Sequence, residues 1–211
     1  MQGLLIVISG FSGVGKGTLI NALLDRYPDA FRLSVSATSR APREGETEGV
    51  EYFFKTEQEF RCMIEDGELL EYAKYNGNYY GTPKAFVYDT LERGRNLILE
   101  IEVTGGMNIK RIFPDAFLVY VLPPSAAELK RRLVNRGTET MEEIGRRLAR
   151  AVEETDCIRN YDYVTVNDDF ETCLEELYRM ICMYRQSMHN RARFSEELKK
   201  ELEDITRTEE E

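Results

Sequence analysis

The sequence contains little that could bind a transition metal. It has one histidine and four cysteines (Cys62, Cys157, Cys173 and Cys182), and no two cysteines form a Cys-x-x-Cys pair. Zinc sites are built from clustered cysteine and histidine side chains, so this scarcity argues against a zinc protein. We expect the cysteines to be the reduced thiols of a cytoplasmic protein.

Long apolar runs and an excess of basic residues are also missing. No apolar run approaches the roughly 18 residues of a membrane span, and no basic segment precedes the first apolar run, so neither a membrane partner nor a signal peptide is expected. Asp and Glu number 38 against 28 Lys and Arg, a net charge of −10. Nucleic-acid binders need a basic face, so we expect no nucleic-acid partner.

A glycine loop follows the first apolar run, Leu4–Ile8, and precedes a helical pattern. Glycines allow a loop to fold around an anion with its backbone N–H groups pointing inward, and a helix N-terminus adds its positive dipole end. The spacing Gly-x4-Gly-Lys is that of a P-loop, with Lys16 placed to contact the outer phosphates of a nucleotide. The expected ATP-binding residues are Gly10, Phe11, Ser12, Gly13, Val14, Gly15, Lys16, Gly17 and Thr18.

The loop departs from the usual motif at one position. The pattern requires Ser or Thr after the lysine, but here Gly17 follows and Thr18 comes one place later. The alternative is a chance glycine turn between a strand and a helix. The helical pattern argues against it, because an apolar face recurs at Leu19, Ile20, Leu23, Leu24 and Tyr27 before Pro28.

Apolar strand candidates alternate with helical patterns along the chain. The candidates are Leu4–Ile8, Leu97–Glu102, Phe117–Leu122 and Tyr163–Val166. Such alternation predicts an α/β fold, a parallel sheet covered by helices in three layers, with ligands at the carboxyl ends of the strands. Three Ser/Thr-x-x-Glu boxes, at Thr56, Ser125 and Thr140, mark helix starts.

Two segments interrupt this alternation. Residues 34–83 are rich in Arg, Gly, Tyr and Thr, with short strand-like pieces at Tyr52–Phe54 and Leu69–Tyr75, and residues 125–159 are helical and rich in Arg. We expect a core of residues 1–33, 84–124 and 160–190 with these two inserts. The charged tail, residues 191–211, has a weak apolar stripe of Leu198, Leu202 and Ile205 and is predicted to be a frayed helix.

The first insert carries two arginines that could share one phosphate. Arg40 and Arg43 are three residues apart with Pro42 between them, a spacing that suits two guanidinium forks on one phosphate. The alternative is a solvated basic turn.

At this point the chain resembles the guanylate kinase family of P-loop nucleoside monophosphate kinases. Residues 36–46 read Ser-Ala-Thr-Ser-Arg-Ala-Pro-Arg-Glu-Gly-Glu, and residues 78–82 read Asn-Tyr-Tyr-Gly-Thr. Later strings also match in the expected order: Leu-Glu-Ile-Glu at 99–102, Arg-Gly-Thr-Glu at 136–139, Arg-Arg-Leu at 146–148, Asn-Tyr-Asp-Tyr at 160–163 and Val-Asn-Asp at 166–168. The resemblance covers roughly residues 3 to 185 and implies transfer of the ATP γ-phosphate to GMP or dGMP.

The resemblance also implies roles for individual residues. The GMP phosphate would be held by Arg40, Arg43, Tyr52 and Tyr80, and the guanine would be read by Ser36, Glu71, Thr82 and Glu102. A carboxylate such as Glu71 can accept both donors on the guanine edge, whereas adenine would leave it facing an acceptor. An unpaired buried polar group costs about 1–3 kcal/mol, which is enough for discrimination. Without the resemblance, Tyr79 and Tyr80 could equally be core aromatics, and a core position is favoured for Tyr79.

On the donor side, the resemblance makes residues 125–159 a lid. Lys16 would bridge the ATP phosphates, and Arg136 and Arg147 would close over the transferring group. Asn167 would contact adenine. Magnesium is expected between the ATP phosphates, with Thr18 as the nearest protein hydroxyl and Glu100 acting through water.

Other arginines of the lid are less telling. Arg132 and Arg146 are neighbours without an assigned role. Arg150 is expected to lie on a solvated face that carries Glu142, Glu143 and Glu153 at ion-pair spacing.

Two departures from the family pattern leave the phosphate clamp intact. Phe11 replaces the usual Pro and should alter the stiffness of the loop more than its chemistry, and Thr104 replaces the usual Gln. Two other functions compete with an active guanylate kinase. A non-catalytic guanylate-kinase-like module would typically lack the loop glycines and Lys16, and an adenylate kinase would not explain residues 36–52. Monomer and homo-oligomer stay open.

Overall fold

The computed structural model describes residues 3–75, 77–137 and 139–208; Thr138 of the Arg-Gly-Thr-Glu string lies outside them. Five parallel strands form a central sheet in the order β2-β7-β1-β8-β9. Their bounds are β1 Leu5–Gly10, β2 Phe31–Leu33, β7 Asn96–Glu100, β8 Phe117–Leu122 and β9 Tyr163–Val166.

Both faces of this sheet are buried, and alternate residues of each strand enter different cores. Leu5 and Val7 of β1 pack on one side, whereas Ile6 and Ile8 pack on the other. This explains why β1 is continuously apolar rather than alternating, since a parallel sheet is covered on both faces. The predicted α/β class with a parallel central sheet is confirmed.

Helices form the outer two layers. Helices α1 (Lys16–Arg26) and α7 (Phe170–Thr208) bury Leu23 and Leu177 on one side. On the other side, α3 (Lys84–Glu92), α4 (Val103–Ile112), α5 (Ala126–Asn135) and α6 (Met141–Thr155) contribute to one core. A short 3-10 turn, η1 (Ile158–Asn160), precedes β9.

Residues 36–83 build a second sheet with its own small core. Its order is β4-β3-β6-β5, formed by β3 (Ser36–Thr38), β4 (Tyr52–Phe54), β5 (Leu69–Tyr75) and β6 (Asn78–Pro83). Helix α2 (Glu57–Glu65) covers it with Phe60, whose ring stacks on Tyr79 at 5.4 Å between centroids. Tyr79 is therefore a core aromatic, as favoured from the sequence.

Some of the observed strands differ from the predicted ones. The strand expected at Leu97–Glu102 ends at Glu100, because Glu102 is the N-cap residue of α4. The strand β2 was not predicted, because three residues carry no detectable alternation.

The helix caps follow the sequence in two of three cases. Thr56 and Thr140 form complete capping boxes with Glu59 and Glu143. The box expected at Ser125 is wrong in one half: its hydroxyl accepts from the Glu128 N–H, but the Glu128 carboxylate pairs with arginines of α5 instead.

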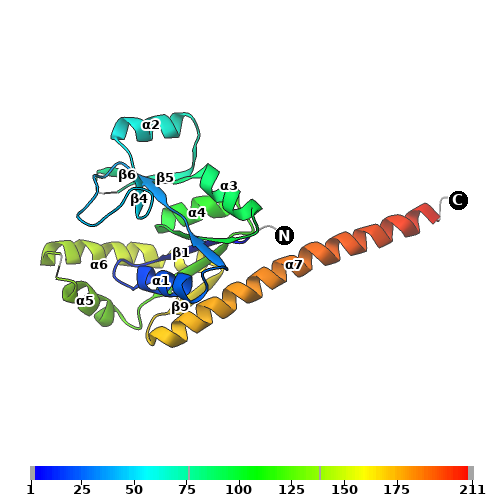
Figure 1. Cartoon of the computed structure of the whole chain (residues 1–211). Coiled ribbons are helices and arrows are strands. Elements are labelled where there is room, and N and C mark those ends of the chain that lie inside the picture. Colours follow the sequence, from blue (N-terminus) through cyan, green and yellow to red (C-terminus); the bar gives the residue numbers. More distant parts are fainter. Residues whose placement is uncertain (1–2, 76, 138, 209–211) are drawn as a thin grey trace.

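The C-terminal helix α7 runs far beyond the body of the molecule (Figure 1). The side chains of Leu174, Leu177 and Ile181 anchor its first turns in the core. The helix predicted for the tail is confirmed for residues 191–208, which continue α7 without a break rather than as a frayed segment. Within the described residues, no helix is long and apolar enough to cross a membrane.

Candidate active site

The loop between β1 and α1 depends on three glycines. Gly10, Gly13 and Gly15 have φ values of 152°, 90° and 96°, which other residues rarely adopt. A Cβ atom at Gly10 would lie 2.3 Å from the Val121 carbonyl oxygen, and one at Gly15 would lie 2.6 Å from the Asn167 Nδ2. Both the backbone conformation and the close approach therefore require glycine.

Lys16 is the first residue of α1, and its side chain folds back over the loop. Its Nζ donates to the Gly10 carbonyl oxygen at 2.6 Å and to that of Phe11 at 3.3 Å. Burial lowers the pKa of Lys16, while the negative charges of Glu100 and Glu102 oppose that shift. The ammonium group thus lies beside the backbone groups that would surround a phosphate.

Two loop residues can offer only their backbone to a ligand. The side chains of Phe11 and Val14 are buried, and the Phe11 ring meets Tyr120 edge-on at 5.6 Å between centroids. Phe11, which stands where the family usually has Pro, therefore anchors the loop in the core.

Arg132 and Asn167 fix the loop from the far side. Asn167 Nδ2 donates to the Val14 carbonyl oxygen at 2.9 Å. Arg132 donates to the same oxygen at 3.2 Å and to the Asn167 carbonyl oxygen at 2.9 Å. The Nε of Arg132 also donates to the Glu128 carboxylate at 2.7 Å. No role was predicted for Arg132, because this contact joins residues that are far apart along the chain.

A cleft of about 380 Å³ joins the glycine loop to the second sheet. Ten residues predicted for the two substrates line it: Gly10, Ser12, Lys16, Ser36, Arg40, Arg43, Tyr52, Glu71, Tyr80 and Glu102. The structure thus brings the loop and the predicted acceptor residues to one cavity.

Of the two arginines of the first insert, Arg40 is held by other side chains, whereas the side chain of Arg43 is exposed. Arg40 forms a two-pronged pair with Glu46, at 2.8 and 2.9 Å, and its guanidinium lies 5.4 Å from the Tyr52 ring centroid. Glu46 also accepts from the Arg43 N–H at 2.7 Å, and Tyr52 meets the Tyr80 ring at 5.9 Å. Glu46 therefore positions the Arg40 guanidinium at the cleft and fixes the backbone at Arg43.

Glu71 lies at the buried end of the cleft. It is 8% exposed and accepts from the Thr82 hydroxyl at 2.7 Å. A Cβ atom at Gly105 would lie 2.9 Å from its other oxygen, so that glycine makes room for the carboxylate. Burial raises the pKa of Glu71, while the Thr82 hydrogen bond opposes the shift.

Two further cleft residues did not figure among the predicted substrate residues. Ser34 follows β2, where its N–H donates to the Ile98 carbonyl oxygen at 2.8 Å. Its hydroxyl is buried and has no hydrogen-bond partner in the part of the chain described. Glu100, the last residue of β7, lines the cleft beside Lys16; desolvation raises the pKa of its carboxyl, while the positive charge of Lys16 opposes that shift.

The arginines of the predicted lid differ in their contacts and exposure. Arg147 donates to the Ser12 hydroxyl of the loop and pairs with Glu139 at 2.9 Å. Arg136 is exposed at the end of α5, although its charge acts on both Lys16 and Glu100. Arg146 lies on the outer face, where it pairs with Glu142 at 2.6 Å.

Arg150 is partly exposed and forms an ion pair along its helix, as predicted, but its carboxylate partners differ from the expected ones. Arg150 pairs with Glu154 at 2.9 Å and reaches across to Glu102 at 2.8 Å. It therefore ties the lid to the start of α4, and the Glu102 carboxylate predicted for guanine is already engaged.

The residues offer few direct ligands for a magnesium ion. Thr18 is exposed and is not among the residues that line the cleft. A Cβ atom at Gly17 would lie 3.8 Å from the Glu100 Oε2, so Glu100 faces the position where the usual motif has a hydroxyl. The described residues hold no group of three or more His, Cys, Asp or Glu side chains that could bind a metal by themselves. This donor set fits a magnesium ion held mainly by phosphates.

Comparisons with known proteins match this chain to one family. The sequence model described as guanylate kinase matches residues 2–184. A guanylate kinase of Halalkalibacterium halodurans is 48% identical over 180 residues, covering 85% of this chain and 88% of that protein. One from Trichodesmium erythraeum is 50% identical over 184 residues, covering 87% and 98%.

The solved structures give the same result. The crystal structure of guanylate kinase from Anaplasma phagocytophilum has a TM-score of 0.70 and 31% identity, and the match covers 86% of each chain. With a family model that spans most of the chain and relatives near 50% identity, this protein belongs to the guanylate kinase family.

Proposed function

We propose that this protein is an ATP:GMP phosphotransferase, in keeping with phosphorylation of GMP by ATP in its family. The observation that carries the proposal is the single cleft that joins an intact glycine loop with Lys16 to the buried carboxylate Glu71. Phosphoryl transfer needs little covalent work from the protein, so catalysis rests on positioning and on charge neutralisation.

On the acceptor side, Arg40 and Arg43 bind the GMP phosphate with the hydroxyls of Tyr52 and Tyr80. The Arg40–Glu46 pair supports this role, because it holds the guanidinium at the cleft before any substrate enters. Ser34, whose hydroxyl has no partner among the described residues, donates to the same phosphate.

Guanine enters the deeper end of the cleft. Glu71 accepts from the N1–H and the 2-amino group, and Thr82 and Ser36 complete the contacts. Because Glu71 is buried, an adenine that lacks both donors would leave it unpaired at a cost of about 1–3 kcal/mol.

On the donor side, the loop backbone and Lys16 bind the ATP phosphates, and Asn167 lies beside the adenine. Arg147 and Arg136 approach the transferring group from the lid. When bound, magnesium would neutralise phosphate charge, and Glu100 or Thr18 would hold it, directly or through water.

The segments predicted from the sequence can be assigned to these separate roles. We assign GMP binding to residues 34–83, the lid to residues 125–159 and the core to residues 1–33, 84–124 and 160–190. The four cysteines are free thiols, which is compatible with a cytoplasmic enzyme.

Phosphorus NMR of ATP and GMP mixed with the enzyme tests the proposal. We expect ADP and GDP to appear in equal amounts, and Lys16→Ala to stop their formation while GMP still binds by calorimetry. ADP and inorganic phosphate without GDP would indicate an ATPase instead. GMP binding without any turnover in the wild type would indicate a non-catalytic module, which the complete loop argues against.

A further inference from the structure

Among the residues that the structure describes, none buries the side chains of the outer part of α7, residues 191–207. The family match ends at residue 184, and every described side chain from residue 191 to 207 is exposed. In proteins, most of the stability of a helix comes from the packing of an amphipathic face rather than from helix propensity. The extension therefore lacks the partner that would stabilise it.

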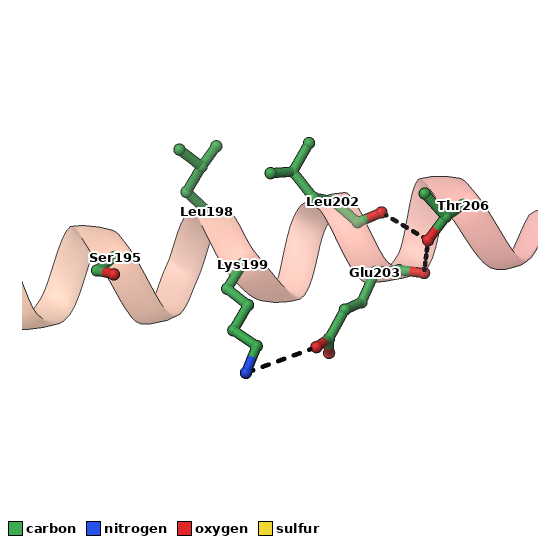
Figure 2. Close-up of a pocket in the computed structure, with 6 residues that line it drawn as sticks. All are labelled: Ser195, Leu198, Lys199, Leu202, Glu203 and Thr206. Atoms are coloured by element: carbon green, nitrogen blue, oxygen red, sulfur yellow. Dashed lines mark hydrogen bonds and ion pairs between the residues drawn. The ribbon is translucent and has the colours of Figure 1, made fainter.

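An apolar stripe runs along this extension. Phe194, Leu198 and Ile205 are 56%, 57% and 56% exposed, far more than core residues. Figure 2 shows Leu198 and Leu202 projecting on one side of the helix, while Lys199 and Glu203 pair at 3.9 Å on another side. A helix with one apolar side and one charged side is typical of a helix that packs against a partner.

One face of the extension has the spacing of a coiled coil. Steps of four and three residues alternate along Ser187, Arg191, Phe194, Leu198, Glu201 and Ile205, which we call the tail seam. These are the a and d positions that face a partner helix. Two of them, Arg191 and Glu201, are charged, and neither has an ion pair in the part of the chain described by the structure.

We propose that the tail seam binds the tail seam of a second copy of this chain, with the two helices antiparallel. If Arg191 of one copy lies opposite Glu201 of the other, the two-fold axis crosses the seam at the height of residue 196, midway between these two residues. Phe194 then lies opposite Leu198, and Ser187 opposite Ile205. The seam is thus self-complementary, as a two-fold interface requires.

The charge distribution selects this orientation over the parallel one. Residues 185–194 carry three arginines and no carboxylate, whereas residues 195–208 carry five carboxylates and three basic residues. Parallel helices would place Arg191 against Arg191 and Glu201 against Glu201. Antiparallel helices pair opposite charges, and such charges set orientation and partner choice in coiled coils.

Sedimentation analysis of the full-length protein and charge-swap variants tests the proposal. We expect the wild type to be a dimer at micromolar concentration. Arg191→Glu and Glu201→Arg should each weaken the dimer about tenfold or more, because each places like charges opposite one another. The double variant restores both ion pairs in reverse and should return to the wild-type dimer.

Two further variants separate the seam from the rest of the surface. Leu198→Asp should give a monomer, whereas Glu196→Gln, on the opposite face of the helix, should leave the dimer unchanged. Circular dichroism checks that each variant folds. The proposal is overturned by a monomeric wild type at tens of micromolar, by a dimer that survives Leu198→Asp, or by a double variant no tighter than the single ones.

Discussion

At the residue scale, Glu71 connects the fold to the choice of base. Burial raises the pKa of its carboxyl above the ordinary value of 4.5, so the folded protein holds this proton more tightly than the unfolded chain does. The contribution of Glu71 to the free energy of unfolding is therefore greatest below its ordinary pKa, and it is lost as the pH rises through the raised value.

The pH dependence of GMP binding should have the opposite sign to the pH dependence of stability that Glu71 causes. Guanine needs the ionised carboxylate, so GMP affinity should rise with pH across the same interval. In Glu71→Gln we expect weaker GMP binding and a flatter pH profile, for both GMP binding and denaturant unfolding. The exposed Glu65→Gln serves as the control. Equal pH profiles in Glu71→Gln and the wild type would remove Glu71 from the base site.

Ser34 offers a second prediction at this scale. Its buried hydroxyl has no partner among the described residues, so Ser34→Ala should leave the free energy of unfolding unchanged or raise it by up to about 1 kcal/mol. If the hydroxyl meets the GMP phosphate, kcat/KM for GMP should fall about tenfold.

Ser39→Ala provides the contrast, because the Ser39 hydroxyl accepts from the Tyr79 N–H at 2.8 Å. That variant should lose stability by about 1 kcal/mol. Denaturant unfolding and steady-state rates measure both effects. A Ser34→Ala enzyme that is less stable and fully active would mean that the hydroxyl has a structural role.

At the scale of elements, α5 supports the loop through Arg132. Replacing it by Gln removes hydrogen bonds to Val14 and Asn167, so we expect a loss of about 1–3 kcal/mol in the free energy of unfolding. KM for ATP should rise more than KM for GMP. The neighbouring Arg131→Gln, which loses only an exposed pair with Glu128, should change neither. An equal rise in KM for ATP and KM for GMP would argue against a role of Arg132 that is confined to the ATP-binding loop.

Comparison of the helices with their predictions shows which features of the structure can be predicted from the sequence. Thr56 and Thr140 cap their helices as expected because capping is a local rule. The Ser125 box is incomplete because Arg131 and Arg132 compete for the Glu128 carboxylate. The contacts of Arg132 with Asn167 and of Arg150 with Glu102 join distant segments, so no local pattern could indicate them.

At the scale of the whole molecule, the first insert lines the cleft, and the second insert meets the glycine loop beside it through the contact of Arg147 with Ser12. Binding of both nucleotides should draw the two inserts together, because closure excludes water from the phosphates. Small-angle scattering should therefore show a smaller radius of gyration with both nucleotides than with either alone. The Arg191→Glu variant is the preferred sample, since association through the tail would alter the scattering. An unchanged radius with both ligands would argue against closure.

The most direct test of the account is the choice of acceptor. The rate of ADP release from ATP is measured with GMP, AMP, CMP and UMP in turn, for the wild type and for Glu71→Gln. We predict rapid turnover with GMP alone, and a loss of about tenfold to a hundredfold in kcat/KM for GMP in the variant. Equal turnover of AMP and GMP by the wild type would contradict the assignment of Glu71 and of the guanine site.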